Sequence, residues 1–313
     1  MSTDWGVDQI TDQSGRTAVV TGANSGLGLS AARELARHGA RVVLACRDLD
    51  KGARAMQSLR AEFPRAELTL AALDLASLQS VQEFADRCLA CEQDGGFDLL
   101  INNAGVMAPP RRVTADGFEL QFGTNFLGHF ALTARLVAAM EARTDARVVT
   151  VSSNAHKMGR INFDDLQSER RYSRWIAYAQ SKLADLMFAL ELDRRLRAAG
   201  STIKSVAAHP GYAATNLQTA APPLLDRLTM QVTNLLVAQS AEQGALALLY
   251  AATAPDVEGG AYVGPDGIGE FRGRPRLVSP NARARDQQTA TRLWEVAEQL
   301  TGVSFQIPSA AAA

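Results

Sequence analysis

The sequence predicts an α/β fold in which one doubly wound, mainly parallel sheet of about seven strands carries helices on both faces. Two observations support this prediction. Short runs rich in valine, isoleucine and leucine alternate with longer segments of helical periodicity, and a glycine-rich turn follows the first of these runs. The 313 residues contain no proline-, glycine- or serine-rich linker that would divide them. We therefore expect residues 1–313 to form a single domain.

Six apolar runs have the length and composition of buried parallel strands. They cover residues 17–21, 41–45, 68–73, 99–101, 147–151 and 203–207, and a seventh strand is expected near 260–263. Helical periodicity covers residues 28–38, 77–91, 127–142, 177–198 and 241–252, and a last amphipathic helix is predicted at 286–301. Alternation of this kind indicates a parallel sheet, because each crossover must return the chain to the same end of the sheet.

One segment, residues 215–239, breaks the alternation. It contains Ala-Ala-Pro-Pro and then an apolar stripe at helical spacing, and it lies between the sixth strand and the next helix. Long connections after parallel strands commonly form binding sites. We interpret this segment as a lid over a substrate; a helix packed on the core is the alternative.

The composition argues against several classes of protein. The 32 Lys and Arg residues balance 33 Asp and Glu residues and form no long run of one sign, so no nucleic-acid partner is expected. The chain has neither an apolar stretch long enough to span a bilayer nor a signal-peptide layout at its start, which predicts a cytoplasmic protein without a membrane span. Cys88 and Cys91 lack the two further ligands that a zinc site needs, so no metal is expected.

The turn after the first predicted strand has the residue types needed to hold a dinucleotide pyrophosphate. It reads Thr21-Gly22-Ala23-Asn24-Ser25-Gly26-Leu27-Gly28. Glycines allow a sharp turn and a close approach of the backbone to phosphate at the start of a helix. Because the turn lies between a strand and a helix, we expect it to bind phosphate, with Gly22, Asn24, Ser25, Gly26, Leu27 and Gly28 at the cofactor.

The end of the second strand indicates which dinucleotide binds. NAD-binding proteins usually place an acid there for the ribose hydroxyls, whereas this chain has Cys46 and Arg47. A guanidinium can bind a 2′-phosphate with two parallel hydrogen bonds, so NADP(H) is predicted as the preferred cofactor. NAD(H) stays the alternative cofactor, because the Asp48 carboxylate could pair with Arg47 in place of a 2′-phosphate.

Together with the glycine turn, Leu73-Asp74-Leu75, Asn102-Asn103-Ala104-Gly105 and Tyr178-Ala179-Gln180-Ser181-Lys182 make the chain resemble the short-chain dehydrogenase/reductase family. The resemblance implies a Rossmann fold and a nicotinamide cofactor. It implies that Asp74 and Leu75 border the adenine and that Asn103, Ala104 and Gly105 form the adenine and ribose wall. By the same resemblance, the cofactor site also includes Pro210, Gly211 and Thr215, with Pro210 and Gly211 near the nicotinamide.

Tyr178 and Lys182 are the residues most directly suited to catalysis. They lie four apart, so a helix would place them on one face. A free phenol has a pKa of about 10, and a nearby ammonium lowers this value toward the working range. We expect Tyr178 to act as general acid or base, and the resemblance implies that Lys182 also binds the nicotinamide ribose.

Two further residues complete the catalytic set that the resemblance implies. Ser153 would donate a hydrogen bond to the substrate oxygen, with Ser152 as the competing candidate, and Asn125 would anchor a water beside Lys182. Of the four histidines, His156 is kept as a residue at the rim of the site.

A narrower similarity to the retinol dehydrogenase branch is carried by three stretches: Cys46-Arg47-Asp48, Asn154-Ala155-His156 and Gly159-Arg160-Ile161-Asn162-Phe163. It implies an apolar aldehyde, ketone or alcohol as substrate, and the family implies a homodimer or homotetramer. Carbonyl reduction is the expected direction. The alternatives are a nucleotide-binding Rossmann protein with a regulatory or scaffold role and no turnover, and an epimerase or dehydratase acting on nucleotide sugars.

Overall fold

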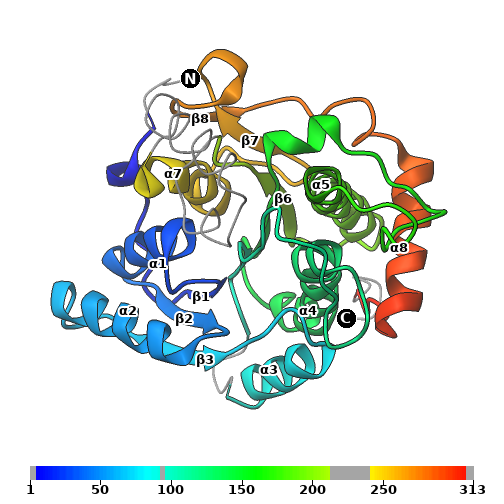
Figure 1. Cartoon of the computed structure of the whole chain (residues 1–313). Helices are drawn as coiled ribbons and strands as arrows, with labels where there is room; N and C mark the ends of the chain where they lie inside the picture. The colour runs from blue at the N-terminus through cyan, green and yellow to red at the C-terminus, as the bar shows by residue number, and fades with distance from the viewer. Residues whose placement is uncertain (1–4, 92–95, 212–239, 308–313) are drawn as a thin grey trace, which may run out of the picture.

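The fold is an eight-stranded sheet with helices on both faces, as seen in a computed structural model that describes residues 5–91, 96–211 and 240–307 (Figure 1). The strand order is β3-β2-β1-β4-β5-β6-β7-β8. The strands are β1 (Thr17–Thr21), β2 (Arg41–Cys46), β3 (Leu68–Ala72), β4 (Leu99–Asn102), β5 (Arg147–Val151), β6 (Lys204–Ala208), β7 (Tyr262–Pro265) and β8 (Pro275–Leu277). The predicted doubly wound α/β class is confirmed, and each of the seven predicted strands is present.

The longer helices, apart from α2, follow the predicted periodicity. They are α1 (Gly26–Arg37), α2 (Leu49–Glu62), α3 (Leu78–Cys91), α4 (Gly128–Leu136), α5 (Arg174–Ala198), α7 (Ala241–Thr253) and α8 (Gln287–Thr301). Asp286 begins the predicted last helix as its N-cap and accepts the amides of Gln288 and Thr289.

Three elements differ from the sequence-based expectation. Helix α2 is not predicted by periodicity, because it buries only Gly52, Ala55 and Leu59. The edge strand β8 adds an eighth strand and runs antiparallel to β7, and with three residues it is too short to give an alternating pattern. The helix predicted at 127–142 is divided, since a π-helical turn, η2 (Phe122–Leu127), precedes α4 and a short 3-10 turn follows it.

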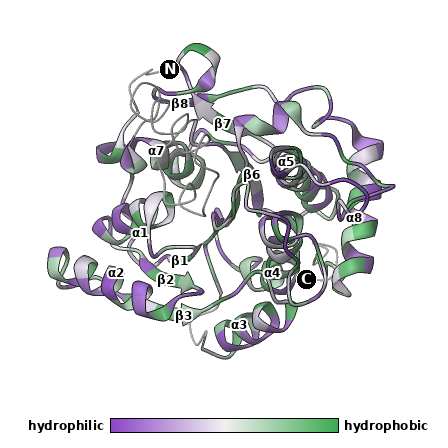
Figure 2. Ribbon diagram, in the orientation of Figure 1, coloured by the Kyte–Doolittle hydropathy of each residue, from purple (hydrophilic) through white to green (hydrophobic). Residues whose placement is uncertain are grey.

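The core has two layers because both faces of the central strands are covered. Strands β1, β4 and β5 are buried along their whole length. Helices α1, α2 and α7 bury apolar residues against one face, and α3, α4, α5 and α8 do so against the other. Figure 2 shows apolar residues concentrated along the strands. Burial on both faces explains why these strands read as continuous apolar runs.

Helix α8 and the chain after it pack against α4 and α5 through a cluster of aromatic rings. Trp294 lies 5.1 Å from Phe130 and 4.4 Å from Phe305, measured between ring centroids. Phe188 of α5 also contacts Trp294 and Phe305. The C-terminal segment therefore fixes the outer side of α5, the helix that carries Tyr178 and Lys182.

Candidate functional site

A cleft of about 760 Å³ opens at the carboxyl ends of β1, β2, β3 and β4. Parallel strands bring these ends to one edge of the sheet, which is where open α/β sheets bind ligands. The cleft brings together eleven of the residues predicted to contact the cofactor: Gly22, Asn24, Ser25, Gly26, Leu27, Arg47, Asp74, Leu75, Asn103, Ala104 and Gly105. Residues far apart in the chain thus share one site, as the sequence motifs predict.

The glycine turn has no room for side chains at two of its positions. Gly22 has a φ of 68°, in the left-handed region that favours glycine. A Cβ on Gly28 would lie 2.5 Å from the carbonyl oxygen of Gly22 and 2.5 Å from the side-chain amide nitrogen of Asn103. The Ser25 side chain makes no capping hydrogen bond to α1. The first amides of α1 therefore face a narrow cradle that fits a pyrophosphate.

A buried network holds this turn against the end of β4. The Asn103 and Ala104 amides both donate to the Thr21 hydroxyl, and the Asn103 side chain donates to the Thr21 carbonyl. His129 Nε2 lies 2.9 Å from the same hydroxyl, and its Nδ1 lies 2.8 Å from the Asn125 carbonyl. Burial lowers the pKa of His129 to about 3, so the ring is neutral and structural.

The end of β2 presents a neutral thiol and two cations. Cys46 is buried, and this burial raises its pKa to about 11, so it carries no charge where an acid would face the ribose. Asp48 caps α2 through the Lys51 amide and forms an ion pair with the Lys51 ammonium at 3.0 Å. Within the described ranges, no ion pair engages the exposed Arg47, which lines the cleft together with Lys51. Lys51 was not predicted from the sequence. The available signal was its position four residues after Arg47, in the first turn of α2.

Tyr178 and Lys182 lie on the inner side of α5, with 9% and 5% of their surfaces exposed. The Lys182 ammonium donates to the Val151 carbonyl at 2.8 Å and to Asp185 Oδ2 at 2.9 Å. Burial acts to lower the pKa of Lys182, but the charge of Asp185 and then the interaction with Tyr178 outweigh it, so the pKa is raised. A Cβ on Gly105 would come within 3.8 Å of the Lys182 nitrogen, so Lys182 lies against the wall of the cleft.

The two candidate serines after β5 have different surroundings. Ser152 is 2% exposed, and its hydroxyl donates to the Lys182 carbonyl at 2.7 Å. Ser153 is partly exposed, and its Oγ accepts the Ala155 amide, which leaves its own proton available to a ligand. The geometry favours Ser153 over Ser152 as the donor to a substrate.

Asn125 lies in the π-helical turn η2 and is fully buried. Its side-chain amide donates to the Val106 carbonyl and to the Ser181 hydroxyl, while its Oδ1 accepts the Val106 amide. Asn125 therefore joins the loop after β4 to α5 beside Lys182. Single π turns inside α-helices are frequent at functional sites, and this one gives Asn125 its inward placement.

The chain after β6 reaches the same edge of the sheet. Gly211 has a φ of 70°, and a Cβ there would collide with the backbone of Phe271. The Gly211 amide donates to Nδ1 of the buried His209, whose Nε2 lies 3.2 Å from Glu270 Oε2. The predicted cofactor residue Thr215 and the predicted lid, 215–239, lie outside the described residues.

The loop that carries Glu270 borders the turn that carries Ser153. The Asn154 side chain donates to the carbonyls of Gly269 and Glu270. His156, predicted at the rim, is fully buried instead, with its Nδ1 2.7 Å from the Ser153 carbonyl. Its burial lowers its pKa to about 4, so it is a neutral support for the Ser153 turn.

Val106, Met107 and Thr124 also line the cleft, and they lie outside the motifs that the sequence analysis identified. Val106 and Met107 extend the Asn-Asn-Ala-Gly segment, and their position after it was the only signal. Thr124 comes from the π-helical turn, which no periodicity reveals.

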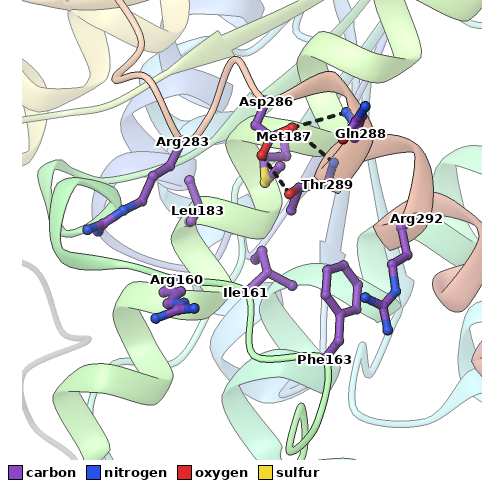
Figure 3. Close-up of a pocket in the computed structure, with 10 residues that line it drawn as sticks. All are labelled: Arg160, Ile161, Phe163, Leu183, Met187, Arg283, Asp286, Gln288, Thr289 and Arg292. Carbon is purple, nitrogen blue, oxygen red and sulfur yellow. Dashed lines mark hydrogen bonds between the residues drawn. The ribbon is translucent and has the colours of Figure 1, made fainter.

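A second pocket, of about 490 Å³, lies on the side of α5 that faces α8 (Figure 3). Its apolar wall is formed by Leu183, Met187, Ile161 and Phe163, and arginines surround it. It shares no lining residue with the cleft. Three of its polar groups already have partners: Asp286 caps α8, Arg292 lies 4.0 Å from the Phe163 ring centroid and Arg283 donates to the Gly159 carbonyl. We therefore place the functional site in the cleft.

Two features are absent from the described part of the chain. No helix there is long and apolar enough to cross a bilayer. Nor does this part contain a group of three or more His, Cys, Asp or Glu side chains placed to hold a metal ion.

Comparison with known proteins agrees with the fold. Residues 16–223 match the family model for short chain dehydrogenases, and the chain belongs to this family. It is therefore an NAD(P)-dependent dehydrogenase acting on CH–OH or C=O groups.

Relatives place the chain in the retinol dehydrogenase-like branch of that family. It is 41% identical to retinol dehydrogenase 12 of Mus musculus over 292 residues, which is 93% of this chain and 88% of that protein. It is 44% identical to polyprenol dehydrogenase of Mus musculus over 299 residues, covering 94% and 86% of the two chains.

A solved structure of an uncharacterized protein from Mycobacterium paratuberculosis is also similar. It is 45% identical, with a TM-score of 0.79, over 97% of this chain and 99% of that chain. A short chain dehydrogenase/reductase from Burkholderia phymatum, solved in complex with NAD, is 27% identical, with a TM-score of 0.60, over 77% of this chain and 87% of that chain.

Proposed function

We propose that this protein is an NADP(H)-preferring oxidoreductase that reduces lipophilic aldehydes or ketones. One observation carries the proposal: the buried Lys182 ammonium lies against the wall of the dinucleotide cleft, one turn along α5 from the buried Tyr178. A charged lysine beside a phenol, at the edge of a cleft shaped for a dinucleotide, is suited to proton exchange at a substrate oxygen.

When bound, the nicotinamide supplies the hydride that carbonyl reduction requires. The residues of the chain act on the carbonyl oxygen of the substrate. The Ser153 hydroxyl donates to this oxygen and stabilises the negative charge that develops on it. Tyr178 gives its proton to the same oxygen, and the Lys182 ammonium stabilises the phenolate that remains. Two of the three Lys182 protons bind Val151 and Asp185, so one is left for the ribose side.

The preference for NADP(H) rests on the end of β2. Cys46 brings no negative charge, and the Arg47 guanidinium lines the cleft with no ion-pair partner among the described residues. Lys51 adds a second cation on the first turn of α2, close to the same position. A 2′-phosphate would meet two positive groups, and a planar guanidinium binds phosphate through paired hydrogen bonds.

Replacing Arg47 with alanine is expected to lower kcat/KM for NADPH about 10- to 100-fold, because charge-assisted hydrogen bonds contribute about 1.5–3 kcal/mol each. NADH has no 2′-phosphate, so its kcat/KM should change less than about threefold by the same reasoning. Steady-state kinetics with both cofactors measure this ratio. Arg65→Ala, which changes an exposed arginine outside the cleft, is the matched control. Equal losses with both cofactors in Arg47→Ala would contradict the assignment.

A lipophilic substrate is supported by exposed apolar side chains beside the proposed catalytic groups. The Trp175 ring lies 6.3 Å from the Tyr178 ring and is 39% exposed. Phe271 and Ile268, 47% and 97% exposed, belong to the loop that the Asn154 side chain holds. The relatives named for retinol and polyprenol take their names from lipophilic alcohols.

The direct test is the oxidation of NADPH, followed by absorbance, with a panel of aldehydes and ketones that differ in chain length and polarity. We expect turnover that increases with the apolar surface of the carbonyl compound and is faster with NADPH than with NADH. Absence of turnover across the panel, with the cofactor still bound, would favour the alternative of a nucleotide-binding protein with a regulatory or scaffold role. The homodimer or homotetramer and the cytoplasmic location stay predictions.

A further inference from the structure

Asp185 is a buried acid one turn beyond Lys182 on α5. Its side chain is 1% exposed, and its Oδ2 lies 2.9 Å from the Lys182 ammonium. Among the residues that the structure describes, the other oxygen, Oδ1, has no hydrogen-bond partner. Within this part of the chain, the carboxylate hydrogen-bonds Lys182 alone, so no other hydrogen bond gives it a separate structural role.

This contact determines how Lys182 is held. The ammonium has only the Val151 carbonyl and Asp185 as hydrogen-bond partners among the described residues. Two fixed acceptors restrict the direction of the third N–H. Asn125 and Gly105 lie close by, since a Cβ on Gly105 would be 3.0 Å from Asn125 Oδ1 and 3.8 Å from the lysine nitrogen.

The same contact determines the charge of the lysine. Burial alone would lower the pKa of Lys182, but the negative charge of Asp185 and the interaction with Tyr178 together outweigh burial and raise it. Burial raises the pKa of Asp185 to about 6 even though Lys182 acts in the opposite direction. Above about pH 6, therefore, both members of the pair are charged.

Few other titratable groups act on this pair. Among the described residues, Tyr178 on the same helix and His129 on α4 interact electrostatically with Lys182. His129 is neutral because burial lowers its pKa to about 3. The neighbouring strand and the π-helical turn present uncharged groups here, Val151 and Asn125. Asp185 is thus the negative charge that balances Lys182.

We propose that Asp185 is a positioning residue that orients the Lys182 ammonium and offsets its charge, and so sets the pH range in which Tyr178 exchanges protons. This inference rests on the proposed function of Tyr178 and Lys182. It assigns no contact with substrate to Asp185, which acts through the lysine.

The expected direction follows from charge. Without the carboxylate, the Tyr178–Lys182 pair lies in a more positive environment, so each of its two protons leaves at a lower pH. Oxidation of an alcohol needs the phenolate together with the ammonium. Its pH profile should therefore be a bell whose acidic and alkaline sides report these two proton losses.

The test compares kcat against pH for alcohol oxidation in the wild type, Asp185→Asn, Asp185→Glu and Asp193→Asn. In Asp185→Asn both sides of the bell should move to lower pH by about one unit, because a neighbouring charge typically shifts a pKa by about 1–3 units. Asp185→Glu keeps the charge and should keep the wild-type pH range. Asp193, a buried acid paired with Arg197 two turns further along α5, is the matched control, and its change to Asn should leave the bell in place.

A second measurement is independent of turnover. The chain has four lysines, Lys51, Lys157, Lys182 and Lys204, so 13Cε-labelled lysine gives few NMR signals. Lys182 is assigned by the signal that Lys182→Met removes. In the wild type this signal should respond near pH 6, as Asp185 takes up a proton, and the response should be absent in Asp185→Asn. The lysine itself should lose its proton at lower pH in that variant.

The outcomes separate this inference from the proposed function. If kcat for alcohol oxidation falls at every pH in Asp185→Asn while the pH range of the profile is unchanged, Asp185 has a purely structural role and the inference is overturned. A wild-type Lys182 signal without any step between about pH 5 and 7 would overturn it as well, even if Asp185→Asn fails to fold. If the wild type turns over no alcohol, the proposed function fails, whereas the NMR titration still decides the role of Asp185.

Discussion

Tyr178→Phe is expected to reduce carbonyl turnover about 10²- to 10⁴-fold, the usual contribution of a positioned general acid. The change removes one oxygen atom from a ring that is 9% exposed, so packing against Trp175 is retained. No replacement donor is at hand among the described histidines near the site, because burial keeps both His129 and His156 neutral. Lys182 cannot substitute, since two of its protons are bound within the protein.

The measurement is kcat at saturating NADPH, together with the dissociation constant of NADPH from fluorescence titration. We expect kcat to fall and the dissociation constant to change less than about threefold, because a phenol lost from the reacting oxygen removes transition-state stabilisation only. Tyr250→Phe is the control, since the Tyr250 hydroxyl donates to Asp256 and its ring packs in the layer on the opposite face of the sheet. Equal turnover in Tyr178→Phe and the wild type would exclude Tyr178 as the proton donor.

Gly28→Ala is expected to impair cofactor binding. The new Cβ would lie 2.5 Å from the Gly22 carbonyl oxygen and 2.5 Å from the side-chain amide nitrogen of Asn103, and the first of these belongs to the backbone of the turn. Relieving such overlap costs about 1–3 kcal/mol, which corresponds to about 10- to 100-fold in affinity if the bound form needs the original turn.

Calorimetric titration of NADPH and NADH into Gly28→Ala measures this loss, which should be similar for the two cofactors because they share the pyrophosphate. The melting temperature should also fall, because Asn103 is linked to β1 through Thr21. Gly6→Ala is the matched control, since a Cβ on Gly6 would meet no atom within 4 Å. Wild-type affinity in Gly28→Ala would show that the cleft does not bind the pyrophosphate at this turn.

Much of the fold was predictable because its strands are buried on both faces and its helices are long. Such strands, β1 and β5 among them, produce continuous apolar runs that are visible without any neighbour. Helix α2 and strand β8 are harder to predict because they lie near the margins of the sheet and bury few residues. The π-helical turn at Asn125 has no periodicity of its own, since its extra residue is stabilised by contacts with Val106 and Ser181.

Local parts of the site follow from the sequence alone: the glycine turn between a strand and a helix, and the Tyr178–Lys182 spacing that a single helix converts into one face. These parts depend on neighbours in the chain, because residue spacing sets short-range geometry. Tertiary structure was needed to show that Ser152 is bonded to the Lys182 carbonyl while the Ser153 hydroxyl proton stays available, and that the local Lys182–Asp185 pair is buried and held by β5. These features depend on burial and on groups from different elements, which fix the protonation states and the free hydrogen-bonding groups after the chain has packed.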